Sequence, residues 1–193
     1  MKIKGLTILL LALACPTTAL ALEVITVEVE KRDGRYFLRG ESIIEAPRDF
    51  IRQIISDYEN FHRLTSGVAE TRFLPDPEGE TPLGYTRIDA CVLFFCRQAV
   101  KVERILVNND SEVLTLVIPE QSDFEFNRTH WQFFDDPKGT LVIYEAEIEP
   151  DFWLPAVIGR WAIKRKLEAS AEEIGARIEY LSDTGRPITD LNL

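Results

Sequence analysis

Hydrophobic and polar residues alternate along much of the chain, which is the pattern of β-strands whose two faces meet different surroundings. The first such run, RYFLRGESIIEA at 35–46, stops at Pro47, a residue that favours the first turn of a helix. Further strand-like runs follow at 68–74, 84–92, 98–107, 111–118, 124–134 and 140–149. Turn signals such as NND and DDPKG separate them. Short strands in succession with tight turns predict an antiparallel meander.

Two segments have helical periodicity instead. After Pro47, apolar residues recur at helical spacing, namely Phe50, Ile51, Ile54, Ile55 and Tyr58. This spacing predicts a short helix with one apolar face. Near the C-terminus, apolar residues again step by three or four, namely Ile163, Leu167, Ala171, Ile174, Ile178 and Leu181. The second pattern predicts an amphipathic helix of about 25 residues, whose apolar side needs a sheet to cover it.

The N-terminus has the pattern of a secretory signal peptide. Two lysines in MKIKG precede the apolar run LTILLLALA, and CPTTALA places Ala19 and Ala21 in the small-x-small arrangement that signal peptidase accepts. The apolar run is too short to span a bilayer as a helix. We therefore expect cleavage after Ala21 and a periplasmic or secreted product, with 22–193 as a single domain. A lipid-modified Cys15 is the alternative.

The charge balance narrows the class of partner. The chain has 22 Lys and Arg against 32 Asp and Glu, a net charge of −10. Removal of residues 1–21 takes away Lys2 and Lys4 and no acid, so the net charge falls to −12. Phosphate contacts need clustered basic side chains, so we expect no nucleic-acid partner. The same balance weakens binding to anionic membranes by charge alone.

The segment DACVLFFCRQ at 89–98 sets two cysteines around four apolar residues. A cysteine pair in an oxidising compartment predicts a disulfide. If the chain reverses within VLFF, Cys91 and Cys96 end facing strands and can reach each other, whereas a straight strand would hold them about 16 Å apart. The apolar tip then lies at a cavity mouth or against a membrane or partner, or it folds back onto the domain's own helices.

The order of these elements resembles that of a known family. SIIEAPRDFIRQIISDYENFHRL is similar to the strand, Ala-Pro and first helix of the START-like, or SRPBCC, superfamily, and within it to the polyketide cyclase/dehydrase and lipid-transport type of domain. THWQFFDDPKGTLVIYEAEIEP and FWLPAVIGRW are similar to its paired late strands and to the Leu-Pro before its last helix. The resemblance covers about residues 36–180. It implies an α+β helix-grip fold, in which a curved antiparallel sheet wraps around the long C-terminal helix and leaves a cavity for apolar ligands.

Several residues are candidates for the wall of such a cavity. On the strand 124–134, aromatic and polar side chains mix on both faces, as a lined pocket requires, although the polar members can instead lie in solvent. Phe152, Trp153 and Trp161 stand where the family's architecture has an apolar gate, with packing between helix and sheet as the alternative. Arg87 either holds a ligand head group or forms a surface pair with Asp89. The candidate cavity residues are Arg87, Phe126, Arg128, His130, Trp131, Tyr144, Trp153 and Trp161. The basic run 164–166 beside exposed aromatics also suggests a transient membrane contact.

No catalytic or metal site is evident in the sequence. The two histidines, His62 and His130, would act as general bases only if they faced the cavity beside a second titratable group. Nucleophile motifs, phosphate loops and metal-ligand spacings are missing, so we predict no catalytic residue, metal or cofactor. We predict an exported binding or carrier protein for a hydrophobic small molecule such as a lipid, quinone or polyketide-like compound. The alternatives are an enzyme acting on a polyketide-like or lipid substrate in the same cavity, and a structural interaction module with a filled core.

Overall fold

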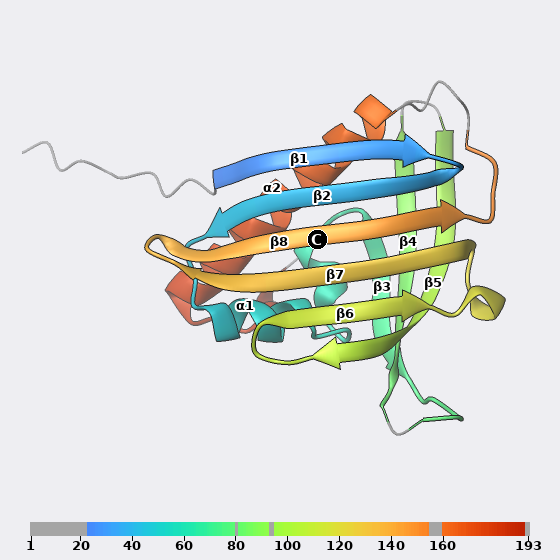
Figure 1. Cartoon of the computed structure of the whole chain (residues 1–193). Coiled ribbons are helices and arrows are strands. Elements are labelled where there is room, and N and C mark those ends of the chain that lie inside the picture. The colour runs from blue at the N-terminus through green and yellow to red at the C-terminus, as the bar shows by residue number, and fades with distance from the viewer. Residues whose placement is uncertain (1–22, 80, 93–94, 155–159, 192–193) are drawn as a thin grey trace, which may run out of the picture.

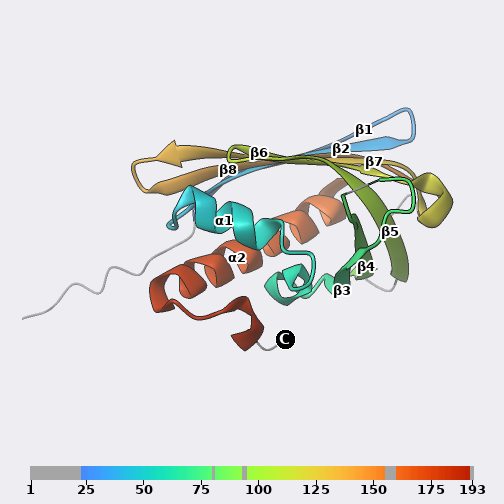
Figure 2. The same cartoon turned by 90° about the horizontal axis from the view of Figure 1, so that it is seen from below.

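The sheet of the protein is curved, and its helices lie in the hollow (Figures 1 and 2). The structure is a computed structural model that describes residues 23–79, 81–92, 95–154 and 160–191. The strands are β1 Glu23–Arg32, β2 Arg35–Ile44, β3 Val68–Leu74, β4 Leu83–Val92, β5 Phe95–Asn108, β6 Glu112–Val117, β7 Phe124–Asp136 and β8 Gly139–Pro150. The helices are α1 Arg48–Ile55 and α2 Arg160–Thr184, with 3-10 turns at Phe61–Leu64, Pro119–Gln121 and Ile188–Asp190. The predicted α+β class is confirmed.

The strands form one antiparallel sheet in the order β1-β2-β8-β7-β6-β5-β4-β3. Strands β3 to β8 follow one another as the predicted meander, and β2 pairs with β8 to add the β1–β2 hairpin at the far edge. A register shift between Ile105 and Val107 marks a bulge where β5 pairs with β6. Bulges increase the local bend of a strand. Beyond this point β3, β4 and β5 turn across the end of the sheet, and α2 lies along the enclosed hollow (Figure 2). This is the predicted helix-grip arrangement.

The edge strand β1 was not predicted from the sequence. It follows the expected signal peptide directly, and its VITVEVE run alternates in the way of a strand. Only Val27 in β1 is fully buried, because an edge strand with one solvent-facing side needs few apolar residues. Seven of the eight strands in the described part of the chain were thus predictable from the sequence.

The packed core lies between α1, the C-terminal half of α2 and the central strands. Its buried members include Ile51, Phe133, Val142, Ile178 and Leu181. The apolar stripe predicted for α2 is confirmed at its C-terminal end, where Ile178 and Leu181 have no exposed surface. At the other end of the helix, Ile163 and Leu167 are only partly buried, and they border an interior cavity.

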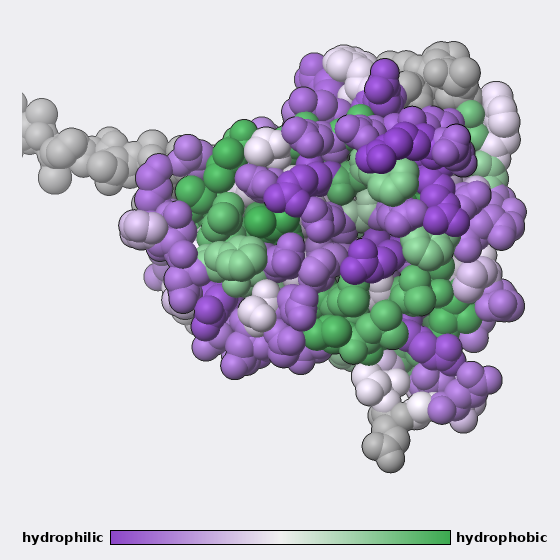
Figure 3. Space-filling view, in the orientation of Figure 1, coloured by the Kyte–Doolittle hydropathy of each residue, from purple (hydrophilic) through white to green (hydrophobic). Residues whose placement is uncertain are grey.

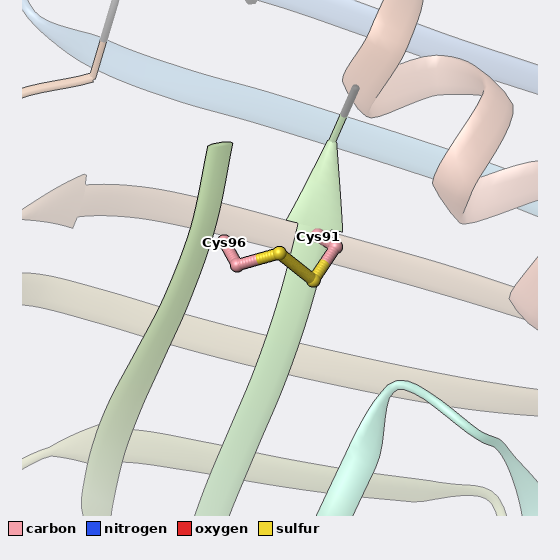
Figure 4. The surroundings of a disulfide bond; sticks show 2 residues. All are labelled: Cys91 and Cys96. Atoms are coloured by element: carbon pink, nitrogen blue, oxygen red, sulfur yellow. A yellow bond between two sulfur atoms is a disulfide. The ribbon is translucent and has the colours of Figure 1, made fainter. Parts of the chain in front are cut away.

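The chain reverses direction between the two cysteines, as the disulfide prediction requires. Strands β4 and β5 form a hairpin in which Cys91 lies opposite Cys96 (Figure 4). Their sulfur atoms are 2.08 Å apart, at bonding distance, and their Cα atoms are 4.0 Å apart. Residues 93–94 at the tip lie outside the described residues, as do the expected signal peptide and Cys15. In the part of the chain that the structure describes, no helix has the length and apolar character needed to cross a membrane.

Candidate functional site

An apolar compartment of about 350 Å³ lies between the N-terminal half of α2 and the concave side of the sheet. Its apolar lining includes Leu38, Ile88, Ile148, Phe152, Ile163 and Leu167. Two cationic side chains, Arg97 and Lys166, also border it. The guanidinium of Arg97 lies 4.6 Å from the centre of the Phe152 ring, so this cation covers an aromatic part of the wall.

A second compartment, of about 230 Å³, continues from the first toward the packed core. The two share the wall residues Thr65, Val68, Ile88, Tyr144, Leu167 and Ser170. We call this second compartment the polar compartment, because the charged side chains of Lys101 and Glu103 on β5 point to the concave side and border it. They lie opposite Thr86 and Gly84 of β4 in the strand register. A Cβ atom at Gly84 would lie 2.3 Å from the Tyr58 ring, so only glycine lets Tyr58 reach this position.

The carboxylate of Glu103 is the centre of a buried polar cluster. The Tyr58 hydroxyl donates a hydrogen bond to Oε1 at 2.6 Å, and the Thr115 hydroxyl donates one to Oε2 at 2.6 Å. The Lys101 ammonium lies 2.9 Å from Oε2. Glu103 is only 2% exposed, and a buried charge needs such partners to offset its lost hydration. Burial, reinforced by the negative charge of Glu103, raises the pKa of Tyr58 well above its ordinary value, so the phenol remains a donor.

Tyr144 of β8 stands where the two compartments meet. Its ring packs against that of Trp131 on β7, with 4.6 Å between the ring centres. Burial raises the pKa of Tyr144, and the charge of Glu103 raises it further, so its hydroxyl also stays protonated. Among the described residues, no protein group forms a hydrogen bond with this hydroxyl. Trp131 and Tyr144 are therefore the sequence-predicted candidates that the structure brings into the cavity.

Three other candidates, Phe126, Arg128 and His130, lie on the outer face of the sheet rather than in the interior cavity. Regular alternation along the strand would place them on the same face as Phe124. A register shift between Phe124 and Phe126 interrupts the alternation, so Phe124 points inward while Phe126 does not. This corrects the expectation that Arg128 or His130 lines the interior cavity. His130 Nε2 instead lies 2.7 Å from Glu112 Oε2.

The outer face is a charged surface. Arg35 forms ion pairs of 2.7 Å with both Glu147 and Glu149, and its guanidinium also covers the Phe126 ring. A polar groove of about 320 Å³ on this face is bordered by Arg128 and His130. Figure 3 shows hydrophilic residues over much of this face. The mixture of polar and aromatic residues on 124–134 thus reflects one face toward the interior and one toward the outer surface, not one mixed pocket wall.

The remaining candidates also lie outside the cavity wall. Arg87 is on the outer side of β4, where it forms ion pairs with Glu70 at 3.3 Å and Asp89 at 3.2 Å. Trp153 and Trp161 are 75% and 65% exposed, so neither packs between helix and sheet. Their neighbour Phe152 lines the apolar compartment instead.

The two histidines have structural partners. His62 Nδ1 lies 3.1 Å from the Thr71 hydroxyl, and burial together with the positive charge of Arg63 lowers the pKa of His62. Neither His62 nor His130 is among the residues that border the interior compartments. The described residues contain no cluster of three or more His, Cys, Asp or Glu side chains suited to a metal ion.

Sequence reasoning missed Tyr58, Lys101 and Glu103. Alternation in QAVKVERILV separates the charged residues from Val100 and Val102, and this pattern favours burial of the valines alone. In the structure Val102 and Glu103 are both buried, although they face opposite sides of β5. Tyr58 was counted only as part of an apolar helical face. A charged residue inside a strand covered on both sides gives no separate signal in the sequence.

The sequence matches the family model described as "Polyketide cyclase / dehydrase and lipid transport" over residues 44–174. The chain belongs to this family. The match supports the START-like resemblance and covers most of α2 and the lining of both compartments except Tyr36 and Leu38. No functionally curated protein matches the sequence.

Solved structures of low sequence identity have the same fold. A STAR-related lipid transfer protein from Xanthomonas axonopodis is similar with a TM-score of 0.59 and 15% identity over 79% of this chain and 98% of that one. A START superfamily protein from Mycobacterium smegmatis has a TM-score of 0.55 and 18% identity, with coverages of 76% and 98%. The Zhui aromatase/cyclase from Streptomyces sp. R1128 has a TM-score of 0.55 and 9% identity, with coverages of 77% and 94%. At these identities the similarity establishes the fold alone.

Proposed function

We propose that the protein binds a hydrophobic small molecule in its interior cavity and carries it without changing it chemically. The observation that supports this most is the continuous pair of compartments, one apolar and one with a few polar groups. Such a combination is typical of ligand pockets, where apolar walls supply affinity and a few polar groups fix orientation. The size of the apolar compartment, about 350 Å³, also argues against a filled-core module.

The alternative is an enzyme acting on a polyketide-like or lipid substrate in the same cavity. The buried cluster of Tyr58, Lys101 and Glu103 favours this alternative, because titratable groups beside one another in a cavity are a common feature of active sites. Two features favour carriage. Glu103 already accepts from Tyr58 and Thr115 and is ion-paired with Lys101, which makes it a poor base. The pKa of Tyr58 is raised, so the phenol does not readily lose its proton.

A cavity-filling variant tests the proposal. Ser170 borders both compartments, so Ser170→Phe is expected to occupy the space where they meet and to reduce ligand binding at least about tenfold. Ala169→Phe is the matched control, because the neighbouring Ala169 is exposed on the same helix. Protein purified from the producing cells is examined by native mass spectrometry for a bound lipid or quinone. The bound species should be present in wild type and in Ala169→Phe and lost in Ser170→Phe.

The same material separates carriage from catalysis. Extracted lipids and quinones are incubated with the protein, and both the bound and the free fractions are analysed by mass. A stoichiometric species of unchanged mass supports carriage. A product that accumulates over many turnovers, and that Glu103→Gln abolishes while Ala169→Phe does not, would establish the enzyme instead.

Export and membrane contact belong to the same proposal. The signal-peptide pattern of residues 1–21 supports export, and the close approach of Cys91 and Cys96 fits an oxidising compartment. Trp153 and Trp161 are exposed beside the apolar compartment, together with the basic side chains Lys164 and Arg165. Exposed tryptophan next to basic residues suits a membrane interface. We propose that ligand exchange takes place with this end of the molecule against a membrane.

A further inference from the structure

The polar compartment offers a bound molecule strong hydrogen-bond donors. An ammonium group has three N–H donors. Among the described residues, Glu103 is the ion-pair partner of Lys101, at 2.9 Å, so further donors of Lys101 are open to a ligand. The Tyr144 hydroxyl is a second donor, because it borders the cavity and forms no hydrogen bond with a described protein group.

The carboxylate of the same compartment is already engaged. Glu103 accepts hydrogen bonds from Tyr58 and Thr115 in addition to its ion pair with Lys101. The Thr115 hydroxyl donates to Glu103, and the Thr129 hydroxyl donates to the Asn127 side-chain oxygen at 3.0 Å. A hydroxyl has a single proton, so neither threonine can donate to a ligand, and Lys101 and Tyr144 are the donors on which the inference rests.

The charges decide which kind of acceptor fits. Lys101 and Glu103 neutralise each other, so the compartment has no uncompensated positive charge among the described residues. A ligand carboxylate would therefore add an unpaired negative charge close to Glu103, at a large desolvation cost. A neutral carbonyl oxygen can accept from both donors without that cost.

We infer that the polar compartment selects ligands with a neutral carbonyl oxygen, such as a ketone, quinone or ester, held by Tyr144 Oη and Lys101 Nζ. This inference rests on the proposed function, since it assigns the buried end of the ligand. The apolar part of the molecule then lies in the apolar compartment beside Phe152, Ile163 and Leu167. In the opposite orientation an anionic head group would lie near Arg97 and Lys166, leaving the polar compartment without a partner.

Matched probes separate these possibilities. Acetylnaphthalene and ethylnaphthalene have nearly the same shape, but only the former has a carbonyl oxygen. Naphthoate replaces the carbonyl with a carboxylate. Dissociation constants are measured by displacement of a neutral fluorescent dye, for wild type and for each variant.

The most direct variant is Tyr144→Phe, which removes the hydroxyl and keeps the ring that packs on Trp131. The Kd of acetylnaphthalene is expected to rise about fivefold, as for the loss of one neutral hydrogen bond, while that of ethylnaphthalene stays within about twofold. Tyr180→Phe is the control. Tyr180 is 42% exposed and borders neither compartment, so loss of its hydroxyl should leave the binding of every probe unchanged.

Lys101 is tested together with its partner. Lys101→Met alone would leave Glu103 buried without its cation, which can prevent folding. The double variant Lys101→Met and Glu103→Gln removes both charges and keeps an amide in place of the carboxylate. The Kd of acetylnaphthalene is expected to rise at least about tenfold more than that of ethylnaphthalene, as for a lost charge-assisted hydrogen bond.

Each result supports the inference or overturns it. The expected pattern is a carbonyl-specific loss in Tyr144→Phe and in the double variant, with Tyr180→Phe unchanged. Equal changes for acetylnaphthalene and ethylnaphthalene would overturn the inference and leave the proposed function standing. Preferred binding of naphthoate, lost in Arg97→Gln, would show that an anionic group lies at the other end and would also overturn it. If no probe binds wild type, the inference and the proposed function fail together.

Discussion

The two halves of α2 meet different surroundings, although one apolar stripe runs along the whole helix. In the C-terminal half, Ile178 and Leu181 are fully buried in the packed core against α1 and the central strands. In the N-terminal half, Ile163 and Leu167 border the apolar compartment. The helix is thus core at one end and cavity wall at the other.

This difference arises from the strands rather than from the helix. At the packed end, β7 and β8 contribute Phe133 and Val142, whose side chains fill the space under α2. The end of the molecule at the N-terminal half of α2, which contains the apolar compartment, is here called the open end. There the concave side of β5 carries Ala99, which is too small to reach the helix, and then Lys101. The apolar stripe of a helix therefore predicts that the helix packs against something apolar. It does not predict whether protein side chains or a ligand fill that space.

The largest expected effect contrasts these two halves directly. Ile178→Ala should lower the free energy of unfolding by about 3 kcal/mol, because it leaves a cavity in a close-packed core. Leu167→Ala should cost about 1 kcal/mol, because it only widens an existing space. Glu172→Ala on the exposed side of the same helix is the control and should be nearly neutral. Urea denaturation measures all three, and equal losses for Ile178→Ala and Leu167→Ala would remove the distinction between the two ends.

The next effect concerns the open end alone. The Cys91–Cys96 disulfide closes a small loop, so its removal should lower the free energy of unfolding by about 2 kcal/mol at most.

Intact mass of protein from the producing cells, with and without reductant, is expected to show a disulfide and an N-terminus at Leu22. Two free thiols in that material would argue against an oxidising compartment, and a lipid attached to Cys15 would replace the predicted cleavage site.

The last expected effect is a change in membrane binding, with little change in stability, and it concerns only the open end. Replacing Trp153 and Trp161 by Ser should reduce partitioning to phosphatidylcholine vesicles that contain phosphatidylglycerol by about tenfold. Tyr180→Ser is the matched control, since Tyr180 is an exposed aromatic residue (42%) in the packed half of α2. Vesicle flotation measures the bound fraction. A similar loss for Tyr180→Ser would show that the open end has no special role.

Much of the fold was predictable because each element has its own period. The α2 stripe, the meander and the reversal between Cys91 and Cys96 follow from local spacing, and the structure confirms them. Strand β1 was missed because it is an edge strand with a single fully buried residue, Val27. Elements that bury a full apolar face are easier to predict than edge elements.

The candidate site was predictable only in part. Trp131 and Tyr144 follow the alternation of their strands and border the polar compartment. Phe126, Arg128 and His130 were assigned to the cavity because the bulge after Phe124 has no signal in the residue types. One additional residue in a strand moves all that follow it to the other face.

By itself, then, the sequence determined the order of the elements from β2 onward, the apolar stripe of the last helix and the family. Tertiary structure alone decided which face of β7 looks inward and that Lys101 and Glu103 are enclosed together with Tyr58. Periodicity is a local property and can be seen in neighbouring residues. The burial of a charged pair depends on partners far apart in the chain, here Tyr58 and Thr115, whose hydroxyls offset the lost hydration of one carboxylate.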